Sequence, residues 1–113
     1  ERIIDVVQTQ PKQFQITLFS IFSLLHHSKS KKGIFTGDVY DFYKDICPKI
    51  GLRPITQRRI SDIIAELDML GLINAKVVSK GRFGRTREIH LSIPNNLLEK
   101  VNKILLKELN IEE

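Results

Sequence analysis

The sequence predicts a mainly α-helical fold with a small β-hairpin near its C-terminal end. Three observations carry this prediction. Apolar residues recur at helical spacing before Gly71, they change to a β-branched, partly alternating pattern after it, and a basic, glycine-rich segment separates two such runs. The 113 residues can bury one hydrophobic core but not two.

The chain starts with Glu and has no cleavable apolar leader, so we expect a piece of a longer protein. Residues 1–8 are expected to be the end of an upstream linker or helix. Residues 9–113 are then expected to form the domain.

The first half of the domain is expected to be helical. Residues Glu1–Val7 should end a helix that the Gln-Thr-Gln-Pro sequence interrupts. Pro11 suits the first turn of the next helix, because its missing N–H leaves no hydrogen bond unmade there. This helix should extend to about His27, and Ser28–Gly33 should be a solvated loop. Apolar residues surround most of this helix, as is typical of a central one: Phe14, Ile16, Leu18, Phe19, Ile21, Phe22, Leu24 and Leu25.

A very short strand and a second helix should follow. Ile34 and Phe35 can form the strand, and Thr36 is then expected to cap the helix with its hydroxyl. Pro48 should shorten or distort the last turn, and Gly51 should end it. The apolar residues of this helix recur at helical spacing: Val39, Phe42, Tyr43, Ile46 and Ile50.

The next helix has the clearest boundaries in the sequence. Thr56 is its expected N-cap, Gln57–Leu70 its expected length and Gly71 its stop. Its apolar residues form one stripe: Ile60, Ile63, Ile64, Leu67 and Leu70.

Two strands should form a hairpin after Gly71. Leu72–Ser79 and Thr86–Ile93 are the strand-like runs, and Lys80–Arg85 is the expected tip, with two glycines for the turn. Pro94 then begins a closing amphipathic helix. This order of helix, helix, turn, helix and hairpin is that of a winged helix-turn-helix, a mainly α fold with a small β-hairpin wing.

The positive charge of the chain is concentrated in its middle. The net charge is +5, from 18 Lys and Arg against 13 Asp and Glu. Between Lys49 and His90 there are 9 basic and 4 acidic residues, so this region accounts for the whole excess. A local basic patch suggests a polyanionic partner. A merely well-solvated surface is the alternative on charge alone.

The start of the third main helix carries the side chains that a major-groove helix needs. On a helical wheel, Arg58, Ser61, Asp62 and Ala65 face away from the apolar stripe. Asp62 and the later acidic residues would repel phosphates, so only the first turns should approach a nucleic acid. Pairing of the arginines with Asp62 along the helix is the alternative. The candidate DNA-binding residues here are Thr56, Gln57, Arg58, Arg59 and Ser61.

The hairpin tip carries the second candidate set. Its crowded cations repel one another in isolation and become favourable against a polyanion, for example in a narrow minor groove. Phe83 could wedge against sugars or bases, or pack back onto the domain. Arg87 is expected to be a strand or phosphate contact rather than a base reader. The candidate residues are Lys80, Gly81, Arg82, Phe83, Gly84 and Arg85.

A longer stretch resembles one family. The segment from Pro54 to Ile89, with Glu-Leu-Asp-Met-Leu-Gly and Ser-Lys-Gly-Arg-Phe-Gly-Arg-Thr as its distinctive parts, closely resembles the C-terminal winged-helix domain of archaeal origin-recognition initiators. These form the origin-recognition-subunit-one and cell-division-control-protein-six family. The resemblance implies DNA binding at replication origins, with the recognition helix in the major groove and the wing in an adjacent minor groove.

The resemblance also implies features outside this chain. A family member carries an ATPase module, with ATP and magnesium, ahead of this domain and helps to load the replicative helicase beside other initiator subunits. This chain has no Gly-x4-Gly-Lys-Ser/Thr loop, so we expect no cofactor in it.

Other chemistry has little support in the sequence. His26 and His27 point about 100° apart on a helix, so we expect no metal site. Cys47, the single cysteine, is expected in the core, and Met69 is expected to pack under the wing. No nucleophile and base accompany the acidic residues, so we expect no enzyme. No stretch is apolar enough to span a membrane, and a single cysteine fits a reducing compartment, so we expect a cytoplasmic, nucleoid-associated protein.

Three other functions stay open at this point. A winged-helix transcription regulator would use the same physics. A protein-interaction module could bind through the same face or through the apolar Pro11–His27 helix. Single-strand binding would need more stacking aromatics than the 7% in this sequence.

Overall fold

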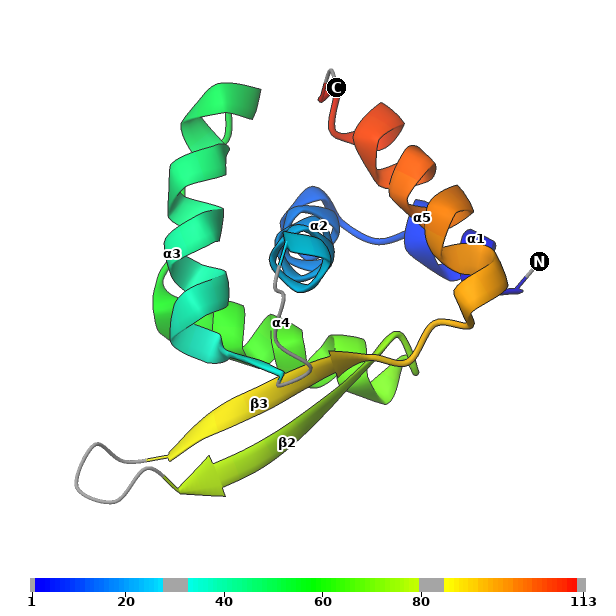
Figure 1. The fold of residues 1–113 in the computed structure, drawn as a ribbon. Helices are drawn as coiled ribbons and strands as arrows, with labels where there is room; N and C mark the ends of the chain where they lie inside the picture. Colours follow the sequence, from blue (N-terminus) through cyan, green and yellow to red (C-terminus); the bar gives the residue numbers. More distant parts are fainter. Residues whose placement is uncertain (1, 28–32, 80–84, 112–113) are drawn as a thin grey trace.

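The computed structural model describes residues 2–27, 33–79 and 85–111, with the side chain of His27 excepted. Its helices and strands follow the predicted order (Figure 1). In chain order they are α1 (Arg2–Gln8), α2 (Lys12–His27), β1 (Ile34–Phe35), α3 (Thr36–Ile46), the 3-10 helix η1 (Cys47–Ile50), α4 (Gln57–Met69), β2 (Ile73–Ser79), β3 (Arg85–Leu91) and α5 (Asn95–Glu108).

Helix α2 lies at the centre of the domain, as its apolar circumference predicted. Figure 1 views it nearly along its axis, with α3 on one side, α5 on the other and α4 below. Ile16, Leu18 and Ile21 are fully buried, and the small polar residues between them bond back to the helix backbone. Burial of a central helix on several sides gives the domain one continuous core.

The sheet has three antiparallel strands in the order β1-β3-β2. Ile89 of β3 is buried at its centre, opposite Ile34 on one side and Ala75 on the other. Because side chains alternate between the faces of a strand, Arg87 and Arg85 lie on the same face as Ile89. We call β2, β3 and the connection between them the wing. Its inner face therefore changes from apolar to basic toward the tip.

The start of α3 corrects one prediction. Thr36 is not the N-cap but the first residue of the helix. The carboxylate Oδ2 of Asp38 accepts a hydrogen bond from the Phe35 backbone N–H at 3.0 Å. The Thr36 hydroxyl instead accepts from the backbone N–H of Arg87 at 3.3 Å, and so extends the pairing of β3 one residue beyond β1. Thr36 does not cap the helix because it lies beside β3, where the backbone N–H of Arg87 has no partner on β1 and needs an acceptor.

The other helix ends agree with the predictions. The Thr56 hydroxyl accepts from the Arg59 backbone N–H at 3.2 Å, which confirms the N-cap. Gly51 and Gly71 have φ angles of 73° and 81°, a left-handed conformation that suits glycine at these helix ends. Helix α4 ends one residue earlier than expected, and β2 begins one residue later than expected. Strand β3 extends from Arg85 to Leu91 instead of from Thr86 to Ile93, so Arg85 belongs to the strand and not to the hairpin tip, because it still pairs with Ser79.

The predicted position is wrong for Met69 and correct for Cys47. Met69 was expected under the wing, but its side chain is 86% exposed at the end of α4, because the chain turns at Gly71 before the wing begins. The packing prediction for Met69 is therefore wrong. Cys47 is buried in the core as expected, and burial raises the pKa of its thiol.

Helix α1 packs against α5 through Ile4 and Val7, which are both buried. Gln15 Nε2 of α2 donates to the carbonyl oxygen of Val7 at 3.1 Å, which fixes the end of α1 to the central helix. The division between residues 1–8 and 9–113 stays a prediction. No described helix is long and apolar enough to cross a membrane.

Candidate nucleic-acid interface

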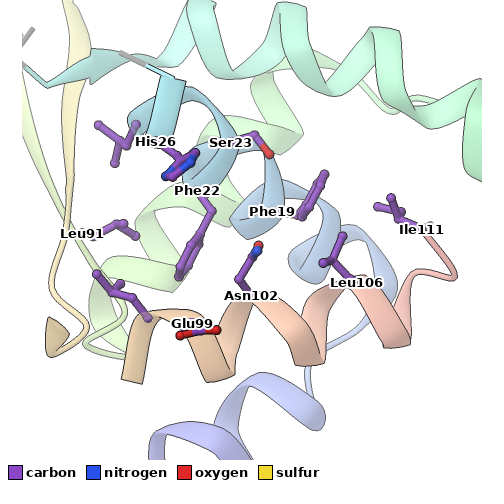
Figure 2. Close-up of a pocket in the computed structure, with 11 residues that line it drawn as sticks. Phe19, Phe22, Ser23, His26, Leu91, Glu99, Asn102, Leu106 and Ile111 are labelled. Carbon is purple, nitrogen blue, oxygen red and sulfur yellow. The ribbon is translucent and has the colours of Figure 1, made fainter. Parts of the chain in front are cut away.

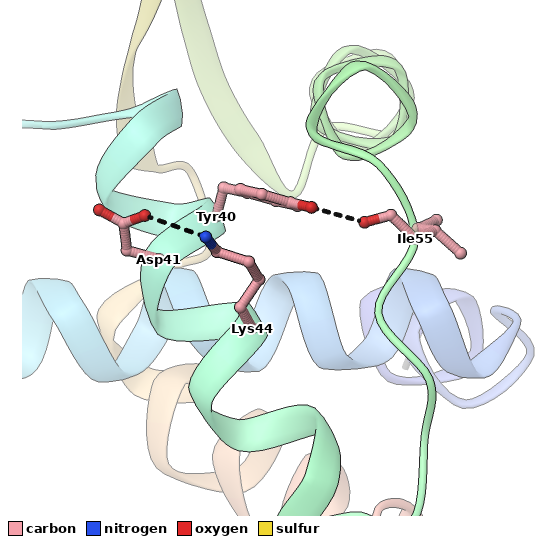
Figure 3. A network of polar contacts seen from close by, with 4 residues as sticks. All are labelled: Tyr40, Asp41, Lys44 and Ile55. Atoms are coloured by element: carbon pink, nitrogen blue, oxygen red, sulfur yellow. Dashed lines mark hydrogen bonds and ion pairs between the residues drawn. The ribbon is translucent and has the colours of Figure 1, made fainter.

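Hydrogen bonds from α3 fix the start of α4. Tyr40 Oη donates to the carbonyl oxygen of Ile55 at 2.9 Å (Figure 3). The Ile55 backbone N–H donates to Tyr43 Oη at 2.9 Å. Ile55 comes directly before the N-cap Thr56. Both polar groups of its backbone are therefore satisfied by side chains of another helix, and this sets where α4 begins.

Tyr43 is the buried member of this network. Its side chain is fully buried, and its hydroxyl donates to Gln13 Oε1 at 2.6 Å while it accepts from Ile55. Burial raises the pKa of Tyr43 to about 12, since an ionised phenolate would lose its hydration there. Tyr40 lies nearer the surface. Lys44 Nζ lies 5.0 Å from the centroid of the Tyr40 ring and 3.9 Å from Asp41 Oδ1.

A hollow of about 460 Å³ opens between the start of α4 and the base of the wing. Helix α4 contributes residues of its first two turns, and β3 contributes the residues next to the hairpin tip. We call it the basic hollow because, among the described residues, three arginines and no carboxylate line it. Its lining residues are Thr36, Gln57, Arg58, Ser61, Val77, Arg85, Thr86 and Arg87.

The described arginines around this face have no carboxylate partners among the described residues. Within residues 2–27, 33–79 and 85–111, no ion pair joins a carboxylate to Arg58, Arg59 or Arg85. The alternative in which the helix arginines pair with Asp62 is therefore not what the structure contains. Unpaired guanidiniums around a concave surface create a positive potential that attracts phosphate groups.

The structure brings together one part of each predicted residue set. Gln57, Arg58 and Ser61 from the helix meet Arg85 from the wing in the basic hollow. Thr56 and Arg59 are exposed beside it but do not line it. Lys80, Gly81, Arg82, Phe83 and Gly84 lie outside the described residues.

Arg87 also lines this site, although the sequence predicted only a strand or phosphate contact for it. Its Nη1 donates to Ser61 Oγ at 2.5 Å and to the Ser61 carbonyl oxygen at 3.1 Å. The signal was in the alternation of β3, because a residue two positions from a buried Ile89 must lie on the same face. Ser61, a candidate DNA-binding residue in the sequence, is half-buried, and its Oγ accepts from Arg87 of the wing.

A second hollow, of about 670 Å³, lies between α2 and α5 (Figure 2). Aromatic and aliphatic side chains make up most of its walls, so we call it the apolar hollow. At the far end of these helices, Lys12 Nζ of α2 donates to the carbonyl oxygen of Glu108. The hollow is lined by Phe19, Phe22, Ser23, Leu25, His26, Leu91, Leu98, Glu99, Asn102, Leu106 and Ile111.

Metal binding has no candidate among the described residues, where no three His, Cys, Asp or Glu side chains gather. His90 Nε2 lies 3.3 Å from Glu88 Oε2 on the wing, as an isolated pair.

Comparison with known proteins decides the family. Residues 5–101 match the family described as CDC6, C terminal winged helix domain. The chain belongs to this family. The match covers most of the chain, including the whole of α4 and the described part of the wing.

Relatives of known name agree with this assignment. The chain is 43% identical over 112 residues to the ORC1-type DNA replication protein 1 of Methanosarcina mazei, covering 99% of this chain and 26% of that protein. It is 52% identical over 89 residues to the ORC1-type DNA replication protein of Pyrococcus horikoshii, covering 79% of this chain and 21% of the relative. This chain thus spans about a quarter of the length of such relatives.

Two solved structures share the fold. The Aeropyrum pernix ORC1 protein, solved in complex with DNA, matches 95% of this chain and 26% of its own with a TM-score of 0.79 and 36% identity. Cdc6p from Pyrobaculum aerophilum has a TM-score of 0.74 over 95% of this chain and 26% of its own. At 19% identity, this second likeness concerns the fold alone. The predicted winged helix-turn-helix is confirmed.

Proposed function

We propose that this chain binds double-stranded DNA sequence-selectively, as the C-terminal domain of an initiator that acts at replication origins. The observation that carries the proposal is the basic hollow, where Arg58 of α4 and Arg85 of β3 share one concave surface and have no carboxylate partner in the described part of the chain. Such a surface suits two neighbouring grooves of a duplex. A relative solved in complex with DNA supports the choice of ligand.

The start of α4 is proposed to enter the major groove. Gln57 and Arg58 have side chains that can form paired hydrogen bonds with adenine and guanine edges. Arg59 and Thr56 flank them, where the exposed N-terminal amides of α4 can approach a phosphate. Ser61 is included among the proposed DNA-binding residues because it lines the same hollow. Its carbonyl oxygen and Oγ both accept hydrogen bonds from Arg87.

The wing is proposed to enter the adjacent minor groove. Arg85 is exposed at its base, and the residues Lys80, Gly81, Arg82, Phe83 and Gly84 of the tip belong to this contact through the family resemblance. A guanidinium in a narrow minor groove benefits from the negative potential there.

The full-length protein is proposed to supply the remaining functions. An ATPase module with ATP and magnesium would lie outside this chain, and helicase loading with other initiator subunits would involve the whole protein. Its place would be the cytoplasm, at the nucleoid. These proposals rest on the family and on relatives that are about four times as long.

The test measures binding of the 113-residue chain to labelled duplexes by fluorescence anisotropy. Selection from a random-sequence duplex library supplies the preferred sequence, and a scrambled version of it is the control. We expect tighter binding to the selected duplex and a steep loss of affinity between about 50 mM and about 200 mM salt. Weaker binding to the matching single strand would exclude a single-strand function.

Two outcomes would overturn the proposal. Salt-insensitive binding would favour a protein-interaction module, because counterion release would then be absent. Equal affinity for selected and scrambled duplexes would leave a DNA-binding domain without sequence selectivity.

A further inference from the structure

Arg87 stands where four elements of the domain meet. Its backbone N–H donates to the Thr36 hydroxyl at the start of α3, and its guanidinium reaches Ser61 of α4. On the other side it is paired with Val77 of β2. It also marks the point on the inner face of the wing where the apolar residues end and the basic ones begin.

The contact to Ser61 is directional. One nitrogen, Nη1, donates both to Ser61 Oγ and to the Ser61 carbonyl oxygen, so the wing is tied to the backbone of α4 as well as to a side chain. A guanidinium holds its donors in a rigid plane, whereas a lysine ammonium is a compact charge on a flexible stem. Arginine at this position therefore fixes an orientation and does not only supply charge.

No carboxylate competes for this guanidinium within the described part of the chain. Its side-chain hydrogen bonds there use Nη1 alone, and a guanidinium has five N–H donors in all. The remaining donors belong to a side chain that lines the basic hollow. Arg87 can thus hold the wing and keep its positive charge beside Arg58 of α4 and Arg85 of β3.

We propose that Arg87 is a positioning residue that locks the wing to the start of α4, so that the contacts of both to the duplex are made as one unit. This inference rests on the proposed function. Without the lock, the wing and α4 would each still carry cations, but their spacing would no longer match the two grooves. Arg87 would then matter for sequence discrimination more than for total affinity.

The test compares Arg87→Lys, Ser61→Ala and the wild type on the selected and scrambled duplexes. Arg87→Lys keeps the charge, so the salt dependence should be unchanged while the ratio of the two affinities falls about tenfold. Ser61→Ala removes the Oγ acceptor and leaves the carbonyl oxygen, so a smaller fall of the same kind is expected. Far-ultraviolet circular dichroism checks that each variant is folded.

Lys76→Gln is the matched control. Lys76 is exposed on β2, next to Val77, and alternation places it on the outer face of the sheet. Its removal deletes a wing charge without touching the lock. The affinity ratio should therefore stay at the wild-type value.

A second readout measures coupling between the two contact regions. In the wild type, Gln57→Ala and Arg85→Ala should interact when combined, because the lock makes one contact depend on the other. In the Arg87→Lys background, the fold-losses of duplex affinity caused by the two substitutions should simply multiply. If both Arg87→Lys and Ser61→Ala keep the wild-type ratio of affinities for the selected and scrambled duplexes, the positioning role of Arg87 is wrong, whereas the proposed function is unaffected. Failure of the wild type to bind any duplex would overturn the proposed function and this inference with it.

Discussion

The basic hollow and the apolar hollow differ in how their walls are held. Around the basic hollow, directed hydrogen bonds fix the parts: Arg87 to Ser61, Thr36 to β3, and the two tyrosines of α3 to Ile55. Around the apolar hollow, the walls are mainly aromatic and aliphatic side chains packed between α2 and α5. The larger hollow is the less charged one. The proposed interface is therefore chosen by its charge and fixed geometry, not by its volume.

The largest expected effect is on the apolar side. Phe22→Ala removes a buried ring that lines the apolar hollow, and such truncations lower the free energy of unfolding by about 3–5 kcal/mol. Urea unfolding measures this change. Duplex affinity, measured at a temperature where the variant is folded, should be unchanged. A large loss of affinity by the folded variant would mean that both hollows serve the same interface.

The next effects are on the basic side and concern binding. Gln57→Ala or Arg58→Ala should reduce the discrimination between selected and scrambled duplexes by about 1–3 kcal/mol, because a base contact is lost. Arg85→Ala should instead lower affinity on all duplexes and reduce the salt slope by about 0.9. Anisotropy titrations at several salt concentrations separate the two patterns. Equal losses on every duplex for the helix variants would restrict α4 to phosphate contacts.

The tyrosine network gives a third effect, on stability. Tyr43→Phe leaves the Ile55 N–H and the Gln13 Oε1 without the hydroxyl, which should lower the free energy of unfolding by about 1–3 kcal/mol. Tyr40→Phe removes a single donor to the Ile55 carbonyl oxygen and should cost about 0.5–1.5 kcal/mol. Urea unfolding of both variants tests the order. A larger effect for Tyr40→Phe would contradict the buried role of Tyr43.

Stability should also fall in alkaline solution through Tyr43. Its pKa rises from 10.0 to about 12 on folding, so the unfolded chain releases this proton first as the pH increases. The stabilising contribution is complete below pH 10 and is lost as the pH approaches about 12. Urea unfolding across this range should show a decline that is weaker in Tyr43→Phe. An identical decline in both proteins would assign it to other groups.

The smallest expected effect is at the N-cap of α4. Thr56→Ala removes the acceptor for the Arg59 N–H and should lower the free energy of unfolding by about 1 kcal/mol. Thr56→Ser keeps the acceptor and should stay near the wild type. Thermal unfolding followed by circular dichroism measures both. No change in Thr56→Ala would show that the tyrosine network alone fixes the start of this helix.

The order of elements was predictable because local signals agreed with the tertiary structure. The stripe in α4, its N-cap Thr56 and its stop at Gly71 each require only neighbouring residues. The cap and the stop are confirmed, and the stripe is buried except for its last member, Leu70, which is 41% exposed where the helix ends. Arg85 was predicted as a candidate from the charge and glycines of the hairpin tip, and the structure places it in the basic hollow with Arg58. Local patterns of charge and periodicity could therefore outline part of this surface.

Long-range contacts were not predictable in the same way. Thr36 and Arg87 are 51 positions apart, and nothing in the local pattern around Thr36 shows that its hydroxyl bonds to β3. Ser61 and Arg87 are 26 positions apart, so a helical wheel shows that Ser61 faces away from the apolar stripe but not that its Oγ bonds to the wing. The prediction that Met69 packs under the wing was wrong for a related reason, since the direction of the chain after Gly71 depends on the packing of the whole sheet.

The edge of the sheet has a consequence for handling the protein. Strand β1 and the Thr36 hydroxyl close one side of β3, so β2 is an outer strand with backbone groups directed away from the sheet. Bare strand edges recruit other strands and lead to aggregation, and a lysine in the middle of such an edge opposes it by repulsion. Lys76 occupies this position beside the exposed Val77. Solubility in concentrated samples is thus expected to depend on a charge that lies outside the basic hollow.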